Sequence, residues 1–190
     1  MAGIDEIRRQ LQERKEAKQA RRDNGRLGEI IVETWFLEVA RADVLRLPQE
    51  RGTKGQLLPE GGKRPDFVVE LDDATFLVDA KLHQTGGLKQ FSLASDEIAD
   101  FRKAMPQLGV EPLVIALIPR EAVDCLFLIG LDEIESANQH GPAGTFNLDL
   151  ADPSRRFGPI TALAFDRAVG RYRDEGYTGY VPAYPATPTP

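Results

Sequence analysis

The sequence predicts a single mixed α/β domain in which helices cover both faces of a central mixed sheet. Three observations indicate this fold. Two short apolar runs flank the acidic pair Asp72-Asp73, two continuous apolar runs of strand length follow at 113–118 and 125–131, and segments of helical periodicity lie before, between and after these runs. Strands and helices in this order favour a sheet layered between helices.

Length and composition agree with a globular fold. The chain has 190 residues, 42% of them hydrophobic and 28% charged, which is enough to bury a core. Its one cysteine, Cys125, allows no internal disulfide and suits a reducing compartment. No stretch has the length and purity of a membrane span, and the charged N-terminus has no apolar signal core. We therefore expect a cytoplasmic protein with no membrane partner.

Residues 3–23 form the first expected helix, because Gln, Glu, Lys, Arg and Ala dominate them. The net charge of the chain is −6, yet seven basic residues against two acidic ones lie between positions 8 and 22. Three interpretations stay open. We favour a solvated helix over a basic arm on a phosphate backbone or a helix that pairs two copies in a homodimer.

Asp23-Asn24-Gly25 is expected to end this helix, and a second, mostly buried helix is expected from about Arg26. A short strand at 44–47 and a basic loop rich in Gly and Pro then lead to the hairpin. We divide the chain accordingly into a basic N-terminal helix or arm at 1–24, an α/β domain at 25–176 and a proline-rich flexible tail at 177–190.

The hairpin brings three charged residues together. A turn centred on Asp72-Asp73 places Asp66 directly opposite Asp79, with Cβ atoms roughly 4.5–5.5 Å apart. Lys81 lies two residues beyond Asp79 and points to the same face. Facing carboxylates repel, and a divalent cation is one physical reason to keep them there. The lysine can then hold or deprotonate an attacking water and neutralise charge on a phosphorane-like transition state.

Pro65-Asp66, twelve intervening residues and Asp79-Ala80-Lys81 resemble the PD-(D/E)xK signature of restriction-endonuclease-like nucleases. The apolar residues before Asp79 fit the same pattern, and the resemblance covers roughly residues 25–131. It implies an αβββαβ core, Mg²⁺ bound by Asp66 and Asp79 (Mn²⁺ would substitute), and Lys81 assisting the water nucleophile.

Gly28-Glu29 resembles the Gly-Glu pair on the helix before the hairpin in the archaeal Holliday-junction resolvase-like branch. This implies Glu29, ahead of Glu33, as a third metal ligand or a water-positioning group, and a solvent-exposed stripe is the alternative. Gln90 matches a glutamine that related nucleases carry on the helix after their lysine, with a surface amide as the alternative. His83 extends the face of Lys81, and we favour a surface role for it.

The remaining elements follow from periodicity. A helix begins at Leu88 or at Ser95, the two continuous apolar runs form interior strands, and a final helix covers 160–172. Residues 132–158 are expected to be a loop, because Asn, Gly and Pro recur in them.

The expected function is that of a metal-dependent nuclease that hydrolyses phosphodiester bonds of DNA, as an endonuclease rather than an exonuclease. The residues expected to carry it are Asp66, Asp79, Lys81 and Glu29, of which Asp66, Asp79 and Glu29 would hold Mg²⁺. The alternative is a catalytically inactive protein of the same fold that binds nucleic acid or serves in an assembly. A third possibility is a domain whose hairpin matches the signature by accident.

Overall fold

The structure is a computed structural model, and it describes residues 4–48, 58–140, 145–150 and 156–185. Most of the expected basic loop, including Arg51 and Lys54, and the end of the expected tail lie outside the described residues. The elements in chain order are α1 (Ile4–Trp35), the π-helical turn η1 (Phe36–Ala40), β1 (Asp43–Arg46), β2 (Phe67–Leu71), β3 (Ala74–His83), β4 (Gln90–Ala94), α3 (Ser95–Leu108), β5 (Leu113–Pro119), β6 (Cys125–Gly130), α4 (Leu131–Glu135), β7 (Asn138–His140), β8 (Thr145–Asp149), β9 (Arg156–Pro159) and α5 (Ala162–Asp174).

The main sheet has six strands in the order β1-β2-β3-β5-β6-β9. Only β3 and β5 run parallel, and the other neighbours are antiparallel, so the sheet is mixed as predicted. A second sheet of three short strands has the order β4-β8-β7. The order α1-β1-β2-β3-α3-β5 contains the αβββαβ core that the sequence resemblance implies, with β4 inserted before α3.

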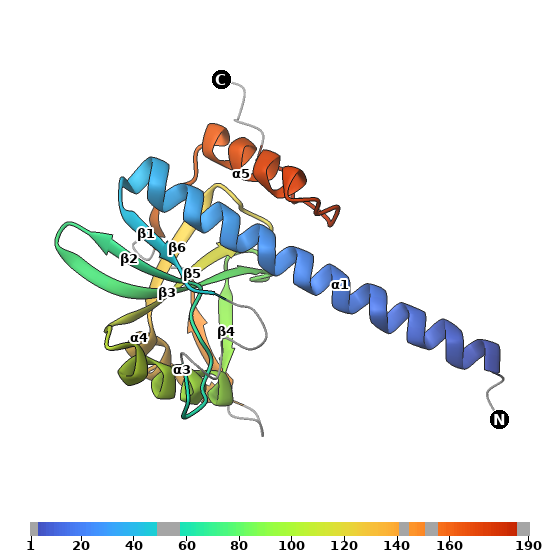
Figure 1. The fold of residues 1–190 in the computed structure, drawn as a ribbon, viewed down its shortest axis with the longest axis horizontal. Helices are drawn as coiled ribbons and strands as arrows, with labels where there is room; N and C mark the ends of the chain where they lie inside the picture. Colours follow the sequence, from blue (N-terminus) through green and yellow to red (C-terminus); the bar gives the residue numbers. More distant parts are fainter. Residues whose placement is uncertain (1–3, 49–57, 141–144, 151–155, 186–190) are drawn as a thin grey trace.

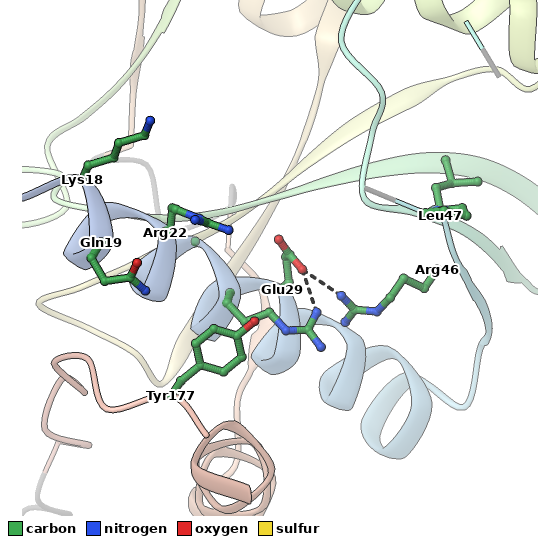
Figure 2. Close-up of a pocket in the computed structure, with 10 residues that line it drawn as sticks. Lys18, Gln19, Arg22, Glu29, Arg46, Leu47 and Tyr177 are labelled. Carbon is green, nitrogen blue, oxygen red and sulfur yellow. Dashed lines mark hydrogen bonds and ion pairs between the residues drawn. The ribbon is translucent and has the colours of Figure 1, made fainter. Parts of the chain in front are cut away.

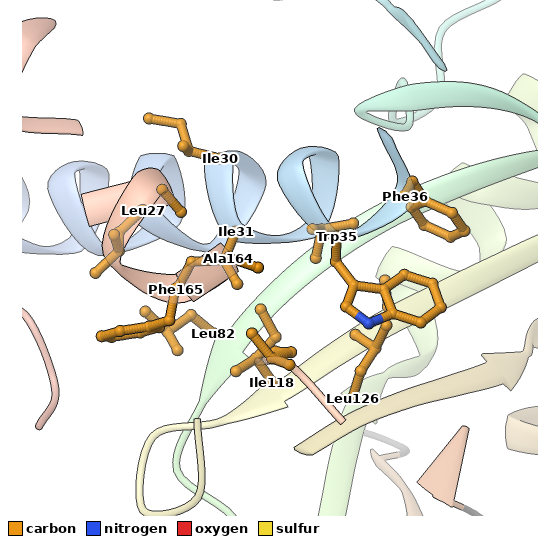
Figure 3. Close-up of a cluster of buried hydrophobic side chains, with 14 of the residues drawn as sticks. Leu27, Ile30, Ile31, Trp35, Phe36, Leu82, Ile118, Leu126, Ala164 and Phe165 are labelled. Atoms are coloured by element: carbon orange, nitrogen blue, oxygen red, sulfur yellow. The ribbon is translucent and has the colours of Figure 1, made fainter. Parts of the chain in front are cut away.

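Each face of the main sheet has its own hydrophobic core. On one face, α1 and α5 pack against Leu82 of β3, Ile118 of β5 and Leu126 of β6 (Figures 1 and 3). On the other face, α3, α4 and the small sheet cover the alternate residues, among them Leu77 and Ile115. Because neighbouring residues of a strand point to opposite faces, Asp79 and Lys81 share the α3 face with Leu77.

The predicted hairpin is confirmed in its register. Val68 pairs with Leu77 and Leu71 pairs with Ala74 across the turn. Asp72 and Asp73 have φ of 48° and 66°, the left-handed conformations that a two-residue hairpin turn requires. The strands expected at 44–47, 113–118 and 125–131 are also present, within a residue or two of their expected limits.

The expected helix break at Asp23-Asn24-Gly25 is wrong, because α1 runs without interruption from Ile4 to Trp35. A glycine inside a helix costs only about 1 kcal/mol relative to alanine. The buried residues that follow it, including Leu27, Ile30 and Ile31, hold the helix against α5 and β3. The Gln19 amide also donates to the Asp23 carboxylate one turn later, at 2.6 Å, which supports the helix before Gly25.

The expected helix start at Leu88 is also wrong, whereas the start at Ser95 is confirmed. Residues Gln90–Ala94 form β4 instead, and within it Phe91 and Leu93 are buried while their neighbours are not. Alternate burial is the pattern of a strand. The helix α3 ends at Leu108, where Gly109 takes the left-handed conformation common after helices.

Residues 132–158 were expected to be a loop, and this too is wrong for the described part of the segment. It contains most of α4, together with β7, β8 and β9. These elements are three to five residues long, so that Gly and Pro in the links between them dominate the sequence pattern. None of the helices in the described ranges has the length and apolarity to cross a membrane.

Candidate active site

Asp66 and Asp79 lie at one end of the hairpin, as the register predicts. Asp79 is in the middle of β3 and is only 2% exposed. Asp66 immediately precedes β2, and its backbone N–H donates to the Val78 carbonyl at 2.9 Å. Its side chain turns toward β3, where Oδ2 accepts a hydrogen bond of 2.8 Å from the Ala80 N–H. The two carboxylates therefore converge on the same stretch of β3.

Lys81 belongs to a closed ring of alternating charges. Its Nζ lies 2.6 Å from Asp79 Oδ2 and donates to Glu97 Oε1 at 2.8 Å. The Lys63 ammonium completes the ring, because it lies 3.3 Å from Asp79 Oδ1 and pairs with the same Glu97 oxygen. Both lysines also face the ring of Phe101, at 4.7 Å from its centroid for Lys63 and 6.0 Å for Lys81.

Sequence reasoning missed Glu97 and gave Lys63 only a place in a basic loop. Glu97 lies in the first turn of α3, sixteen residues after Lys81, and reaches the site only because α3 packs under the sheet. Lys63 is held close to α3 by its N–H, which donates to the Asp100 carbonyl at 3.1 Å. Gly62 permits this approach, because its φ is 102° and a Cβ there would meet the same carbonyl oxygen at 2.7 Å.

Glu29 lies on α1, which covers the other face of the sheet. A Cβ added to Gly28 would lie 3.0 Å from Leu82 Cβ, so a glycine lets α1 cross β3 closely, one residue beyond Lys81. The Glu29 carboxylate accepts hydrogen bonds from Arg26 at 2.8 Å and from Arg46 at 2.7 Å (Figure 2). The Gly28-Glu29 pair in which the sequence resembles the resolvase-like branch is therefore also the point where α1 crosses β3.

Glu33, the other candidate for a third acidic group, is one turn further along α1. It is buried and pairs with Arg46 and Arg171, each at 2.7 Å. The negative charge of Glu29 raises the pKa of Asp66, whereas the charge of Glu33 acts on Glu29. The electrostatics thus favour Glu29 over Glu33 as the third carboxylate of the site.

The charges of the site perturb one another strongly. Burial first, then the negative charges of Asp79 and Glu29, hold the pKa of Asp66 well above its usual range. Burial opposes the charge of Lys81, but Asp79 and Glu97 outweigh it and raise the pKa of the ammonium. Burial also opposes the charge of Glu97, but the two lysines lower the pKa of this carboxyl. Perturbed groups that gather in this way are typical of functional sites.

His83 and Gln90 take no part in these contacts. His83 is exposed, its Nδ1 lies 2.8 Å from the Gln84 carbonyl oxygen, and its ring packs edge-on to Phe91. Gln90 is an exposed residue of β4 rather than of the following helix, so the matched glutamine position is wrong for it.

A metal site would have to be open. Among the described residues, no three side chains of the His, Cys, Asp or Glu type are grouped closely enough to enclose a metal ion. Asp66 and Asp79 nevertheless fit a hard divalent cation, because Mg²⁺ is commonly held by one or two carboxylates together with water and substrate phosphates. Burial, and then the charges of Asp79 and Glu29, raise the pKa of Asp66, and a cation bound there would favour its charged form.

Asp66→Asn should therefore stabilise the protein in the absence of metal. The folded-state pKa of Asp66 lies above the unfolded value of 3.8. The stability that protonated Asp66 contributes is therefore fully present below pH 3.8 and is lost as pH rises through the folded-state pKa. Asparagine stays neutral and can still accept from Ala80. A gain of about 1 kcal/mol corresponds to a Tm increase of roughly 2–4 °C at pH 8 in EDTA, with a smaller gain at pH 5.

Differential scanning fluorimetry from pH 5 to pH 8 measures this effect, and Asp166→Asn, an exposed position on α5, is the matched control. A Tm that falls for Asp66→Asn, or a gain that does not grow with pH, would contradict the assignment of a strained carboxylate.

Comparison with known proteins finds similarity only among solved structures. No protein-family model matches the chain, and no curated protein matches it. Among solved structures it resembles Archaeoglobus fulgidus Hjc, a Holliday junction resolvase from an archaeal hyperthermophile, with a TM-score of 0.44 and 16% sequence identity over 72% of this chain and 94% of that chain. This overlap is modest, and the function proposed below rests on the side chains of the site.

Proposed function

We propose that this protein is a Mg²⁺-dependent nuclease that cleaves DNA phosphodiester bonds as an endonuclease. One observation carries the proposal. Asp66 and Asp79 meet at the end of the hairpin, where Asp66 accepts from the Ala80 N–H and Lys81 Nζ lies 2.6 Å from Asp79. Two acidic groups and an amine at this spacing are the parts that metal-assisted phosphodiester hydrolysis needs.

In this proposal Asp66 and Asp79 hold the cation, and Glu29 assists through a bound water. The cation, when bound, polarises the scissile phosphate and lowers the pKa of the attacking water. Asp79 is well suited to its part because it is almost completely buried, so its charge is poorly screened by solvent. Glu29 is already held by Arg26 and Arg46, so we expect it to act through a bridging water rather than as a direct ligand.

The lysines supply positive charge and donors. Lys81 stays protonated, because Asp79 and Glu97 raise the pKa of its ammonium. It therefore orients the water and stabilises the negative charge that develops on the phosphate, rather than removing a proton. Lys63 carries a second ammonium on the opposite side of Asp79 and can contact a phosphate oxygen next to the cleaved bond. Glu97 positions both ammonium groups and touches no substrate.

Cleavage of supercoiled plasmid and of synthetic duplex and branched DNA tests the proposal. We expect nicking or cutting with Mg²⁺ or Mn²⁺ and none in EDTA, and we expect Asp79→Asn to lower the rate by at least about 10²-fold. Calorimetry should detect Mn²⁺ binding to the wild type and weaker binding to Asp79→Asn. Circular dichroism must first confirm that the variant folds. Activity that persists in EDTA, or an equally active Asp79→Asn, would refute the proposal.

The ion pairs themselves favour one second candidate. Both oxygens of Asp79 face lysines, and the Glu29 carboxylate faces two arginines, so the charges of these groups are balanced without a metal. A catalytically inactive protein that binds nucleic acid or serves in an assembly would have this site. Binding of DNA without cleavage under several metals and substrates would support this candidate. The cytoplasmic location and the homodimer stay predictions.

A further inference from the structure

A row of positive charges runs along one face of α1. Arg14, Lys18, Arg22 and Arg26 are spaced four residues apart, so their side chains stack along one side of the helix. Among the described side chains of α1, the basic residues that have acidic partners are Arg9 and Arg26. The first three residues of the row are exposed and repel one another, because like charges at this spacing are unfavourable in a helix.

The inner half of the row borders a cavity of about 1150 Å³. Lys18, Arg22 and Arg26 line it from α1, and Arg46 lines it from β1. In Figure 2, Lys18, Arg22 and Glu29 project from the same side of the helix, and Arg46 approaches Glu29 from the far wall. The cavity thus contains four cations and a single carboxylate among its charged lining, and that carboxylate already pairs with two of the arginines.

This cavity leads to the candidate active site. Glu29 is part of its lining, and the neighbouring Gly28 packs against Leu82 of β3, one residue beyond Lys81. The row therefore begins on the half of α1 that extends away from the sheets (Figure 1), and its inner members line the cavity together with Glu29. At about 1.5 Å per residue, the distance from Arg14 to Arg26 is roughly 18 Å, which equals about five successive phosphates of one DNA strand.

We infer that this row and cavity bind the phosphate backbone of double-stranded DNA and lead it to the site of cleavage. The choice of DNA as the polyanion rests on the proposed function. A second copy of the chain fits the row less well, since identical rows of positive charge repel. Leu11 is the one large apolar side chain between Arg9 and Arg22, too little to form a helix-pairing stripe.

The test is a binding measurement that does not depend on cleavage. Fluorescence anisotropy with a duplex of about 30 base pairs in EDTA compares the wild type with the triple variant Arg14→Gln, Lys18→Gln and Arg22→Gln. Three lost phosphate contacts lower the slope of log Kd against log salt by about 2 to 3, and weaken binding roughly 100-fold at 0.1 M salt. Glutamine is a good helix former, so circular dichroism should report an intact α1.

The matched control changes net charge equally at another surface. Lys89→Gln, Lys103→Gln and Arg167→Gln replace exposed cations outside the row, and this variant should bind within about threefold of the wild type. Equal losses in the two triple variants, or a wild type that does not bind duplex DNA, would overturn the inference. A protein that cuts DNA while the row variant binds normally refutes the inference alone. A protein that never cuts, but whose row variant loses binding, refutes only the nuclease function.

Discussion

Lys81→Met should abolish nearly all DNA cleavage and leave the fold intact. Lys81 lies beside both Asp79 and Glu97 from within β3, next to the proposed cation ligands, whereas Lys63 contacts the other oxygen of Asp79 from the segment before β2. Methionine retains the length and apolar stem of lysine, so the substitution removes only a positive charge and three hydrogen-bond donors. Removal of a group of this kind typically costs 10²- to 10⁴-fold in the rate of the chemical step.

Single-turnover cleavage at saturating enzyme and Mg²⁺ measures this loss, and anisotropy in EDTA should find DNA binding nearly unchanged. Lys103→Met is the matched control, since this lysine is exposed on α3 and outside the ring. If Lys81→Met kept cleavage within about fivefold of the wild type, the lysine would have no part in the reaction, and the proposed mechanism would need another charge donor.

Phe101→Ala should have the largest effect on stability. Phe101 is completely buried in α3 within the core on that face of the sheet. Truncation of a buried phenylalanine costs about 3–5 kcal/mol, a large share of the roughly 5–15 kcal/mol that stabilises a domain. Its ring also lies under the ammonium groups of Lys63 and Lys81, so the variant should lose activity even under conditions in which it stays folded.

Urea denaturation followed by far-ultraviolet circular dichroism measures the loss of stability. Phe101→Leu keeps most of the apolar volume and removes the aromatic face, and so separates packing from the contact with the lysines. Tyr180→Ala is a control at an aromatic residue that is 68% exposed, and we expect a change of less than about 0.5 kcal/mol there. A similar cost at both positions would mean that Phe101 is not a core residue in solution.

The hairpin and the strands could be predicted because their signals are local. Asp72-Asp73 fixes the turn, the turn fixes the register, and the register brings Asp66 to Asp79. The run from Leu113 to Pro119 is almost uniformly apolar because both of its faces are covered, and this is visible in the sequence without knowledge of the rest of the fold.

The errors arose where distant packing outweighs local preference. Asp23-Asn24-Gly25 has the composition of a helix terminus, but buried contacts of the following turns keep α1 continuous. The small sheet was missed because its strands are short and their partners lie far along the chain, although the alternation of Phe91 and Leu93 was a usable signal. Glu97 could not be placed at the site from sequence, because only the docking of α3 brings it to Lys81.

Because α1 is continuous, its packed half also keeps its outer half helical. Every side chain from Arg9 to Ala20 is exposed, so tertiary packing contributes little to this segment. An isolated helix of that length is marginal in water, because its first turn is costly to nucleate. Here the packed half acts as the nucleus, and the outer turns need only propagate from it. The outer turns of α1 are therefore helical only because the packed half is helical. If the packing of α1 against α5 were weakened, the outer turns should lose their helical structure first.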